Sequence, residues 1–168
     1  MAKSLKEKVR GMYSRMKSRR ADESISSEGI AKFILGSLGA HLRNYPGEKD
    51  TNIDAQWYYE VTKGLLDTYV EYVAGNVTSQ DVAPEIRKTY RHLYDRFLQM
   101  ADENGGLRRN PQFNPGLKVM SLIYNSSDQK LEEAIGIAKE GNMQGIPKLE
   151  QLIDLYQRDK SSYTSKAH

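Results

Sequence analysis

Apolar residues recur at intervals of three and four along most of this chain, and this spacing places side chains on one face of an α-helix. The first long stripe consists of Ile30, Phe33, Ile34, Leu38 and Leu42. Ser26 and Ser27 precede it where an N-cap belongs, so we expect the helix to begin near Glu28. The Tyr-Pro-Gly turn signal at residues 45–47 predicts its end.

Two further helices are predicted from the same period. The second begins at Asn52 or Asp54 and ends before the Gly-Asn pair at 75–76. Its stripe is Trp57, Val61, Leu65, Tyr69, Tyr72 and Val73. The third has Pro84 in its first turn and ends at the Asn-Gly-Gly sequence of residues 104–106. Its stripe is Ile86, Tyr90, Leu93, Phe97 and Met100.

The rest of the chain reads as a long loop followed by shorter helices. Residues 105–115 contain two prolines and several glycines and asparagines, which predict irregular structure. Shorter helices are expected over residues 117–124, over 128–139, and from Pro147 through Tyr156. No alternating apolar and polar run indicates a strand. The pattern therefore predicts an all-α fold, a helical bundle of about four to six helices with an N-terminal basic helical arm.

The opening segment has its own helical pattern. Leu5, Val9, Met12 and Met16 form one apolar stripe between residues 4 and 20. One flank of this stripe carries Lys3, Lys6, Arg10 and Lys17, and the other carries Lys8, Arg15 and Arg19. The face opposite the stripe is mostly serine and glycine, so a bulky partner can approach the backbone closely. We divide the chain into a basic arm (residues 1–22), a helical body (23–160) and a polar tail (161–168).

Charge separates the arm from the rest of the chain. Of 25 basic residues, eight lie in the first twenty positions, where Glu7 is the one acid, whereas the following positions hold 17 basic and 21 acidic residues. The eight are Lys3, Lys6, Lys8, Arg10, Arg15, Lys17, Arg19 and Arg20. The overall net charge of +3 therefore conceals a strongly polar molecule, and such polarity indicates an anionic partner.

A nucleic-acid duplex suits the arm, because its basic rows reach phosphates on both sides while the small face settles against the backbone. Such binding does not depend on base sequence. Double-stranded DNA is the favoured partner. Two alternatives stay open: a solvated basic extension without a partner, and an amphipathic helix on an anionic membrane. The membrane alternative has a thin apolar anchor, with no Trp or Phe in the arm.

Composition narrows the remaining function classes. The chain has no cysteine, which excludes disulfide frameworks, thiolate nucleophiles and the commonest zinc sites. No apolar run approaches the roughly 20 residues that cross a bilayer, and the N-terminus does not read as a secretory signal. We therefore expect the protein to function in the compartment where it is made, or in an assembly built there.

No pattern of catalytic residues emerges. His41, His92 and His168 are scattered, and neither phosphate-binding loops nor hydrolase or metalloprotease motifs occur. We predict no enzyme, no metal and no cofactor. Secondary basic candidates for nucleic-acid binding are Arg87, Lys88, Arg91, Arg108 and Arg109. As isolated surface charges, these residues are more often simply solvated.

Tyrosine is unusually common, with eleven tyrosines against three phenylalanines. Tyrosine suits half-buried contact surfaces, where the ring packs and the hydroxyl stays in water. Tyr58, Tyr59, Tyr69 and Tyr72 cannot all face one core stripe. Either these residues are ordinary boundary residues of the bundle, or several of them form contacts between subunits.

A short basic helix, a serine-rich hinge (ADESISSEG) and a compact helical body resemble the major capsid proteins of filamentous and rod-shaped archaeal viruses, of the lipothrixvirus and rudivirus type. The resemblance implies that two related coat proteins pair and that their N-terminal helices wrap linear double-stranded DNA in the A form. It also implies that the basic residues between Lys3 and Arg20 hold the DNA, while the bodies form the wall of a virion assembled in the host cytoplasm.

Other function classes fit the same pattern. A helical-bundle chaperone or adaptor, similar to flagellar export chaperones, is suggested by the stretches KFILGSLGAHL and GLLDTYVEY. A small subunit of a cellular nucleoprotein complex is a third possibility, with a cytoplasmic location. Contact with a viral membrane envelope also stays open as a partner interaction.

Overall fold

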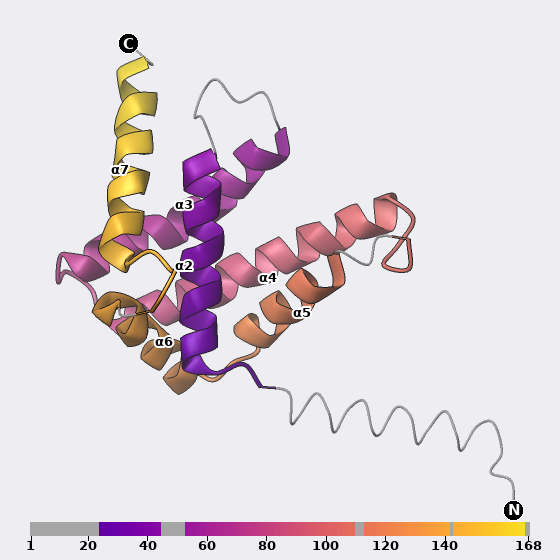
Figure 1. Cartoon of the computed structure of the whole chain (residues 1–168), viewed down its shortest axis with the longest axis horizontal. Helices are drawn as coiled ribbons and strands as arrows, with labels where there is room; N and C mark the ends of the chain where they lie inside the picture. Colours follow the sequence, from indigo (N-terminus) through magenta and orange to yellow (C-terminus); the bar gives the residue numbers. More distant parts are fainter. Residues whose placement is uncertain (1–23, 45–52, 110–112, 142, 167–168) are drawn as a thin grey trace, which may run out of the picture.

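The computed structural model describes residues 24–44, 53–109, 113–141 and 143–166, and these ranges form six α-helices without a strand (Figure 1). The helices are α2 (Ser27–Asn44), α3 (Ile53–Val73), α4 (Ser79–Glu103), α5 (Phe113–Tyr124), α6 (Asp128–Glu140) and α7 (Leu149–Lys166). This confirms the predicted all-α bundle of four to six helices. The predicted arm of residues 1–22 lies outside the described residues.

The longest described helix, α4, is the centre of the arrangement. It packs against α3, α5 and α6, while α2 packs against α6 and α7, and α7 also contacts α3. Figure 1 shows α5 running back along the C-terminal half of α4. Because α4 contacts three other helices, only one side of it is left to face solvent.

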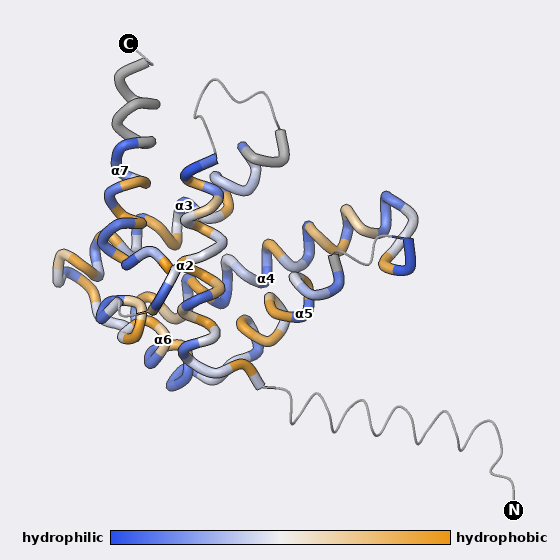
Figure 2. The backbone as a smooth tube through the Cα atoms, in the orientation of Figure 1, coloured by the Kyte–Doolittle hydropathy of each residue, from blue (hydrophilic) through white to orange (hydrophobic). Residues whose placement is uncertain are grey.

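The apolar stripes form a single core. In α2, the predicted residues Ile30, Ile34, Leu38 and Leu42 are all buried. Together with Leu65 from α3, Ile86 and Leu93 from α4, Leu131 and Ile135 from α6, and Leu152 from α7, they make one cluster. Figure 2 shows hydrophobic and hydrophilic stretches alternating along the helices, as expected for elements that bury one face.

Of the first three predicted helix starts, those of α2 and α3 are confirmed and that of α4 is wrong. Ser26 caps α2, since its Oγ accepts from Gly29 N at 3.0 Å. The third predicted helix, α4, begins at Ser79 rather than near Pro84. Asp81 accepts from the Thr78 N–H at 2.8 Å and from the Thr78 hydroxyl at 3.1 Å, so this cap by the Asp81 carboxylate starts the helix earlier. Pro84 then lies in the second turn, where its missing N–H removes one helical hydrogen bond.

The predicted loop over residues 105–115 is too long, because α5 begins at Phe113. Its third residue is Pro115, a position whose backbone N–H has no partner within the helix, so proline costs nothing there. The turn that precedes the helix uses Gly105 and Gly106, both with positive φ. The prediction was therefore right for the two glycines and wrong for Pro115, which lies in the first turn of a helix.

Helix α6 begins as expected, whereas α7 begins at Leu149 instead of Pro147 and is longer than predicted. For α6, Ser127 accepts from Lys130 N at 3.2 Å, and Gly141 ends the helix with φ of 69°. For α7, the Gln151 amide oxygen accepts from Lys148 N at 2.9 Å and fixes the first turn. The helix continues to Lys166, so most of the expected polar tail is helical.

Three tyrosines are core residues rather than boundary residues. Tyr69, Tyr90 and Tyr156 are almost completely buried. Burial raises the pKa of Tyr69 and Tyr90, and burial followed by a hydrogen bond to Asp67 raises the pKa of Tyr156. In that bond the Tyr156 hydroxyl donates to Asp67 Oδ1 at 2.6 Å and joins α7 to α3. These tyrosines are therefore explained by packing.

Candidate nucleic-acid interface

The eight basic residues of the arm all lie in a segment outside the described residues. They are Lys3, Lys6, Lys8, Arg10, Arg15, Lys17, Arg19 and Arg20. Their role in binding stays a prediction from the sequence. The secondary basic candidates belong to the described part of the chain, and the structure separates them into three groups.

Arg87 is a structural residue. Its guanidinium donates to the carbonyl oxygens of Tyr124, at 3.3 Å, and Ser126, at 3.0 Å, and it forms an ion pair with Asp128 at 2.6 Å. These contacts connect α4 to the turn between α5 and α6. The N–H groups of Arg87 are largely occupied within the protein, which leaves little capacity for a ligand.

Arg91, one turn later, is placed differently. Its side chain is 65% exposed, and its guanidinium carbon lies 5.3 Å from the centre of the Tyr124 ring. Asp95 lies 3.7 Å from Arg91 Nε, and its own side chain is 62% exposed. A pair of this length and exposure is weak, so Arg91 is held mainly by its stacking on the ring.

The structure places Arg96 in a similar position to Arg91, with its guanidinium over an aromatic ring. Arg96 was not among the basic candidates predicted from the sequence. Its guanidinium carbon lies 5.7 Å from the centre of the Trp57 ring, and Nη1 donates to Gln99 Oε1 at 3.3 Å. Trp57 belongs to α3, so this contact joins residues far apart in the sequence. The one available signal was that Arg96 follows the other basic residues within the same predicted helix.

Lys88 connects Arg91 and Arg96 on the surface. Two shallow hollows lie on the outer side of α4, of about 640 and 360 Å³, and both are lined by Lys88 and Arg91. The larger hollow extends over Tyr124 towards the α5–α6 turn, and the smaller extends over Trp57 and Arg96. We call Lys88, Arg91 and Arg96, with the two rings, the α4 basic face. His92 lies on the same side and is exposed.

Arg108 and Arg109 are not part of the α4 basic face. They follow the C-terminus of α4 in a turn where Arg109 N donates to Gly106 O at 3.2 Å, and both are exposed. More than ten residues of α4 separate Arg91 from the helix end, a distance of roughly 18 Å at 1.5 Å per residue. The five candidates predicted from the sequence therefore do not form one site.

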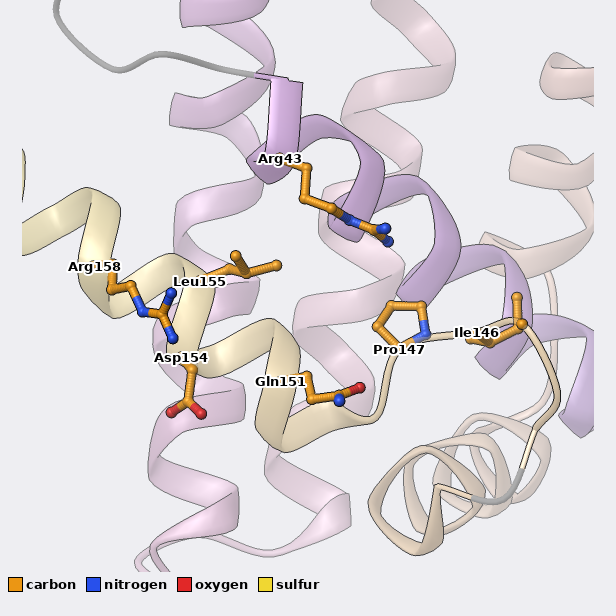
Figure 3. Close-up of a pocket in the computed structure, with 8 residues that line it drawn as sticks. Arg43, Ile146, Pro147, Gln151, Asp154, Leu155 and Arg158 are labelled. Carbon is orange, nitrogen blue, oxygen red and sulfur yellow. The ribbon is translucent and has the colours of Figure 1, made fainter.

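A third hollow, of about 470 Å³, lies between the end of α2 and the first half of α7 (Figure 3). The α2 backbone approaches closely at Gly39, where an added Cβ would lie 3.0 Å from Pro147 Cγ. Arg43, Arg158 and Asp154 supply charges of both signs, and Ile146, Pro147 and Leu155 supply apolar surface. This mixed lining favours no polyanion.

Among the described residues, no group of histidines and carboxylates is placed to hold a metal ion. His41 packs against the ring of Tyr58, with 4.5 Å between centroids, and so contributes to the core edge. None of the helices formed by the described residues is long and apolar enough to span a membrane.

Comparisons with known proteins do not extend this picture. No protein-family model, no curated protein and no solved structure matches the chain.

Proposed function

We propose that this protein is a structural nucleic-acid-packaging protein that binds double-stranded DNA without regard to base sequence, through the basic helix of residues 1–22. The observation that supports the proposal is the segregation of charge. Eight basic residues and one acid occupy the first twenty positions, while the rest of the chain has four more acids than bases. Phosphates attract such an arm through charge alone, and base recognition is not required.

In its most specific form, the proposal makes the chain a coat subunit of a helical nucleoprotein filament, as its resemblance to archaeal viral capsid proteins implies. The described helices supply a body suited to this role, because α2 to α7 bury a common core. In such a filament the arm binds the nucleic acid while the body contacts other subunits. DNA packaging of this kind needs no catalytic group in the protein.

The first test neutralises one row of the arm in the full chain, with Lys6→Gln, Arg10→Gln and Lys17→Gln combined. Binding to labelled duplex DNA is measured by fluorescence anisotropy over a series of salt concentrations. The slope of log affinity against log salt should become shallower by up to about 2.7, since each lost phosphate contact contributes about 0.9. A second duplex of unrelated sequence should give the same slope.

A matched control removes the same charge from the body, with Lys63→Gln, Lys139→Gln and Lys148→Gln, which are exposed residues on α3, α6 and the loop before α7. The control should retain the parent slope. An arm variant that binds DNA as the parent does would refute the proposal. Loss of binding to anionic vesicles, with DNA binding unchanged or absent, would instead identify the arm as a membrane helix.

The coat assignment has its own test. The purified protein mixed with linear double-stranded DNA should form regular filaments visible by electron microscopy, and the arm variant should not. Purified material that instead carries a stoichiometric protein partner, with weak salt dependence, would favour the chaperone or adaptor class.

A further inference from the structure

We propose that the α4 basic face is a second contact for the phosphate backbone of nucleic acid, separate from the arm. The inference rests on the proposed function in one respect, which is that the phosphates belong to a nucleic acid. Three observations on the described residues support it: the spacing of the cations, the way they are held, and the small amount of acidic charge among them.

The cations lie on the outer side of α4, with Arg91 leaning towards Tyr124 of α5 and Arg96 towards Trp57 of α3. From Lys88 to Arg96 the helix advances by eight residues, or about 12 Å at 1.5 Å per residue. One strand of duplex DNA presents a phosphate about every 3.4 Å along its axis, so the three cations cover roughly three phosphate intervals. The buried positions Ile86, Tyr90 and Leu93 lie on the other side of the helix. The three cations therefore face away from the core.

The two arginines are held in place before any ligand arrives. The Arg91 guanidinium lies over the Tyr124 ring, and the Arg96 guanidinium lies over the Trp57 ring. A guanidinium that rests on a ring keeps its N–H edge available for phosphate oxygens, and less side-chain freedom is lost on binding. Each guanidinium group covers one face of its ring, so that face is not open for a base to stack on. The surface therefore offers mainly N–H donors to a ligand. This favours phosphate over base contact.

The third observation is the balance of charge. Among the residues that line the two hollows, Asp95 supplies one carboxylate. The cations that line them are Arg87, Lys88, Arg91 and Arg96. Arg87 is neutralised by Asp128, which leaves three cations against one acid. The Asp95 pair with Arg91 is long and exposed, so a phosphate can compete for this guanidinium. The α4 basic face thus stays cationic within a body that is acidic overall.

The test uses the full chain with Lys88→Gln and Arg91→Gln combined. The control is the Lys63→Gln and Lys148→Gln pair, which removes equal charge from exposed positions elsewhere. Anisotropy with duplex DNA should give a salt slope shallower by about 0.9 to 1.8 for the α4 variant, and an unchanged slope for the control. Circular dichroism should show parental helicity for both variants. Arg91→Lys keeps the charge but loses the planar guanidinium over the Tyr124 ring, so its affinity should fall between the parent and the double variant.

The outcomes separate this inference from the proposed function. If the arm variant loses slope and the α4 variant does not, the arm binds DNA and the α4 inference is wrong. If the parent chain binds no nucleic acid, both fail. If the α4 variant changes self-association in sedimentation while its DNA slope matches the control, the face is a contact between subunits and not a phosphate site. Inorganic phosphate as competitor at matched ionic strength should weaken the parent more than the α4 variant.

Discussion

Alkaline unfolding is the sharpest test of the core. Tyr69, Tyr90 and Tyr156 are almost completely buried, and burial raises the pKa of each above the ordinary value of 10.0. In the unfolded chain the same groups lose their protons near pH 10. The folded state therefore binds more protons than the unfolded state above that pH. Stability is fully present below pH 10 and is lost as the pH rises beyond it.

The size of the effect follows from the number of buried hydroxyls. Each tyrosine that stays protonated only in the folded state contributes about 1.4 kcal/mol per pH unit. Tyr69, Tyr90 and Tyr156 together give a loss of about 4 kcal/mol per pH unit above pH 10. Burial also raises the pKa of Tyr58, which acts in the same direction. Since domains of this kind have a total stability of about 5–15 kcal/mol, we expect the body to unfold within roughly one to four pH units of that point.

The assay follows tyrosinate absorbance and far-ultraviolet circular dichroism in the same alkaline titration. Part of the eleven tyrosines should ionise while helicity is intact, and the buried three should ionise together with the loss of helix. Tyr156→Phe should reduce the pH dependence of stability by about 1.4 kcal/mol per pH unit. Ile135→Val, at a fully buried position, should lower stability by about 1 kcal/mol at every pH without changing that dependence.

The reasoning would be refuted if all tyrosines ionised in one step near pH 10 with the helices intact. It would also fail if Tyr156→Phe and Ile135→Val gave parallel curves of stability against pH. Either result would mean that these hydroxyls are accessible to water in the folded protein.

Two further predictions concern single positions. Arg87→Gln should lower the free energy of unfolding by about 1–2 kcal/mol in a denaturant titration, because it breaks the connection from α4 to the α5–α6 turn. The control variant Arg91→Gln should have a free energy of unfolding within about 0.5 kcal/mol of the parent. Gly141→Ala should destabilise the protein by about 1 kcal/mol, since the φ of Gly141 is 69° and the new Cβ would lie 3.0 Å from a Lys148 atom. Gly136→Ala should instead raise the melting temperature, because Gly136 lies inside α6 with open space around it. Equal shifts for the two alanine variants would contradict the backbone argument.

Local signals in the sequence predicted most helix positions, and they failed where two of them competed. Ser26 and Gly141 act through neighbours within four residues, so the ends that they mark were readable. At the start of α4, Pro84 suggested one first turn and the Thr78–Asp81 cap another, and the structure follows the cap. A proline in the second turn of a helix removes one backbone hydrogen bond. The burial of the apolar stripe of α4, a helix of 25 residues, easily offsets this loss of stability.

The candidate site was harder to predict because its contacts join distant parts of the chain. Arg87 and Arg91 are one helical turn apart and look equivalent in the sequence. Their difference arises from partners 37 to 41 residues later for Arg87, and from the ring of Tyr124 for Arg91. The sequence identified the basic residues of α4, and the fold decides which of them hold the protein together and which face outwards.

Under the proposed function, the charge pattern also links assembly to the nucleic acid. Without DNA, basic arms repel one another, while the arm of one subunit is attracted to the acidic body of the next. Duplex DNA carries negative charge at far higher density than the body, so it competes successfully for the arms. A duplex neutralises the arms and, through the α4 basic face, part of the positive charge on the body as well. Two separated contacts on one chain raise the effective concentration of the second once the first is made. Subunits should therefore gather on DNA in preference to each other, and an arm with its charges reversed in sign should no longer be able to start this process.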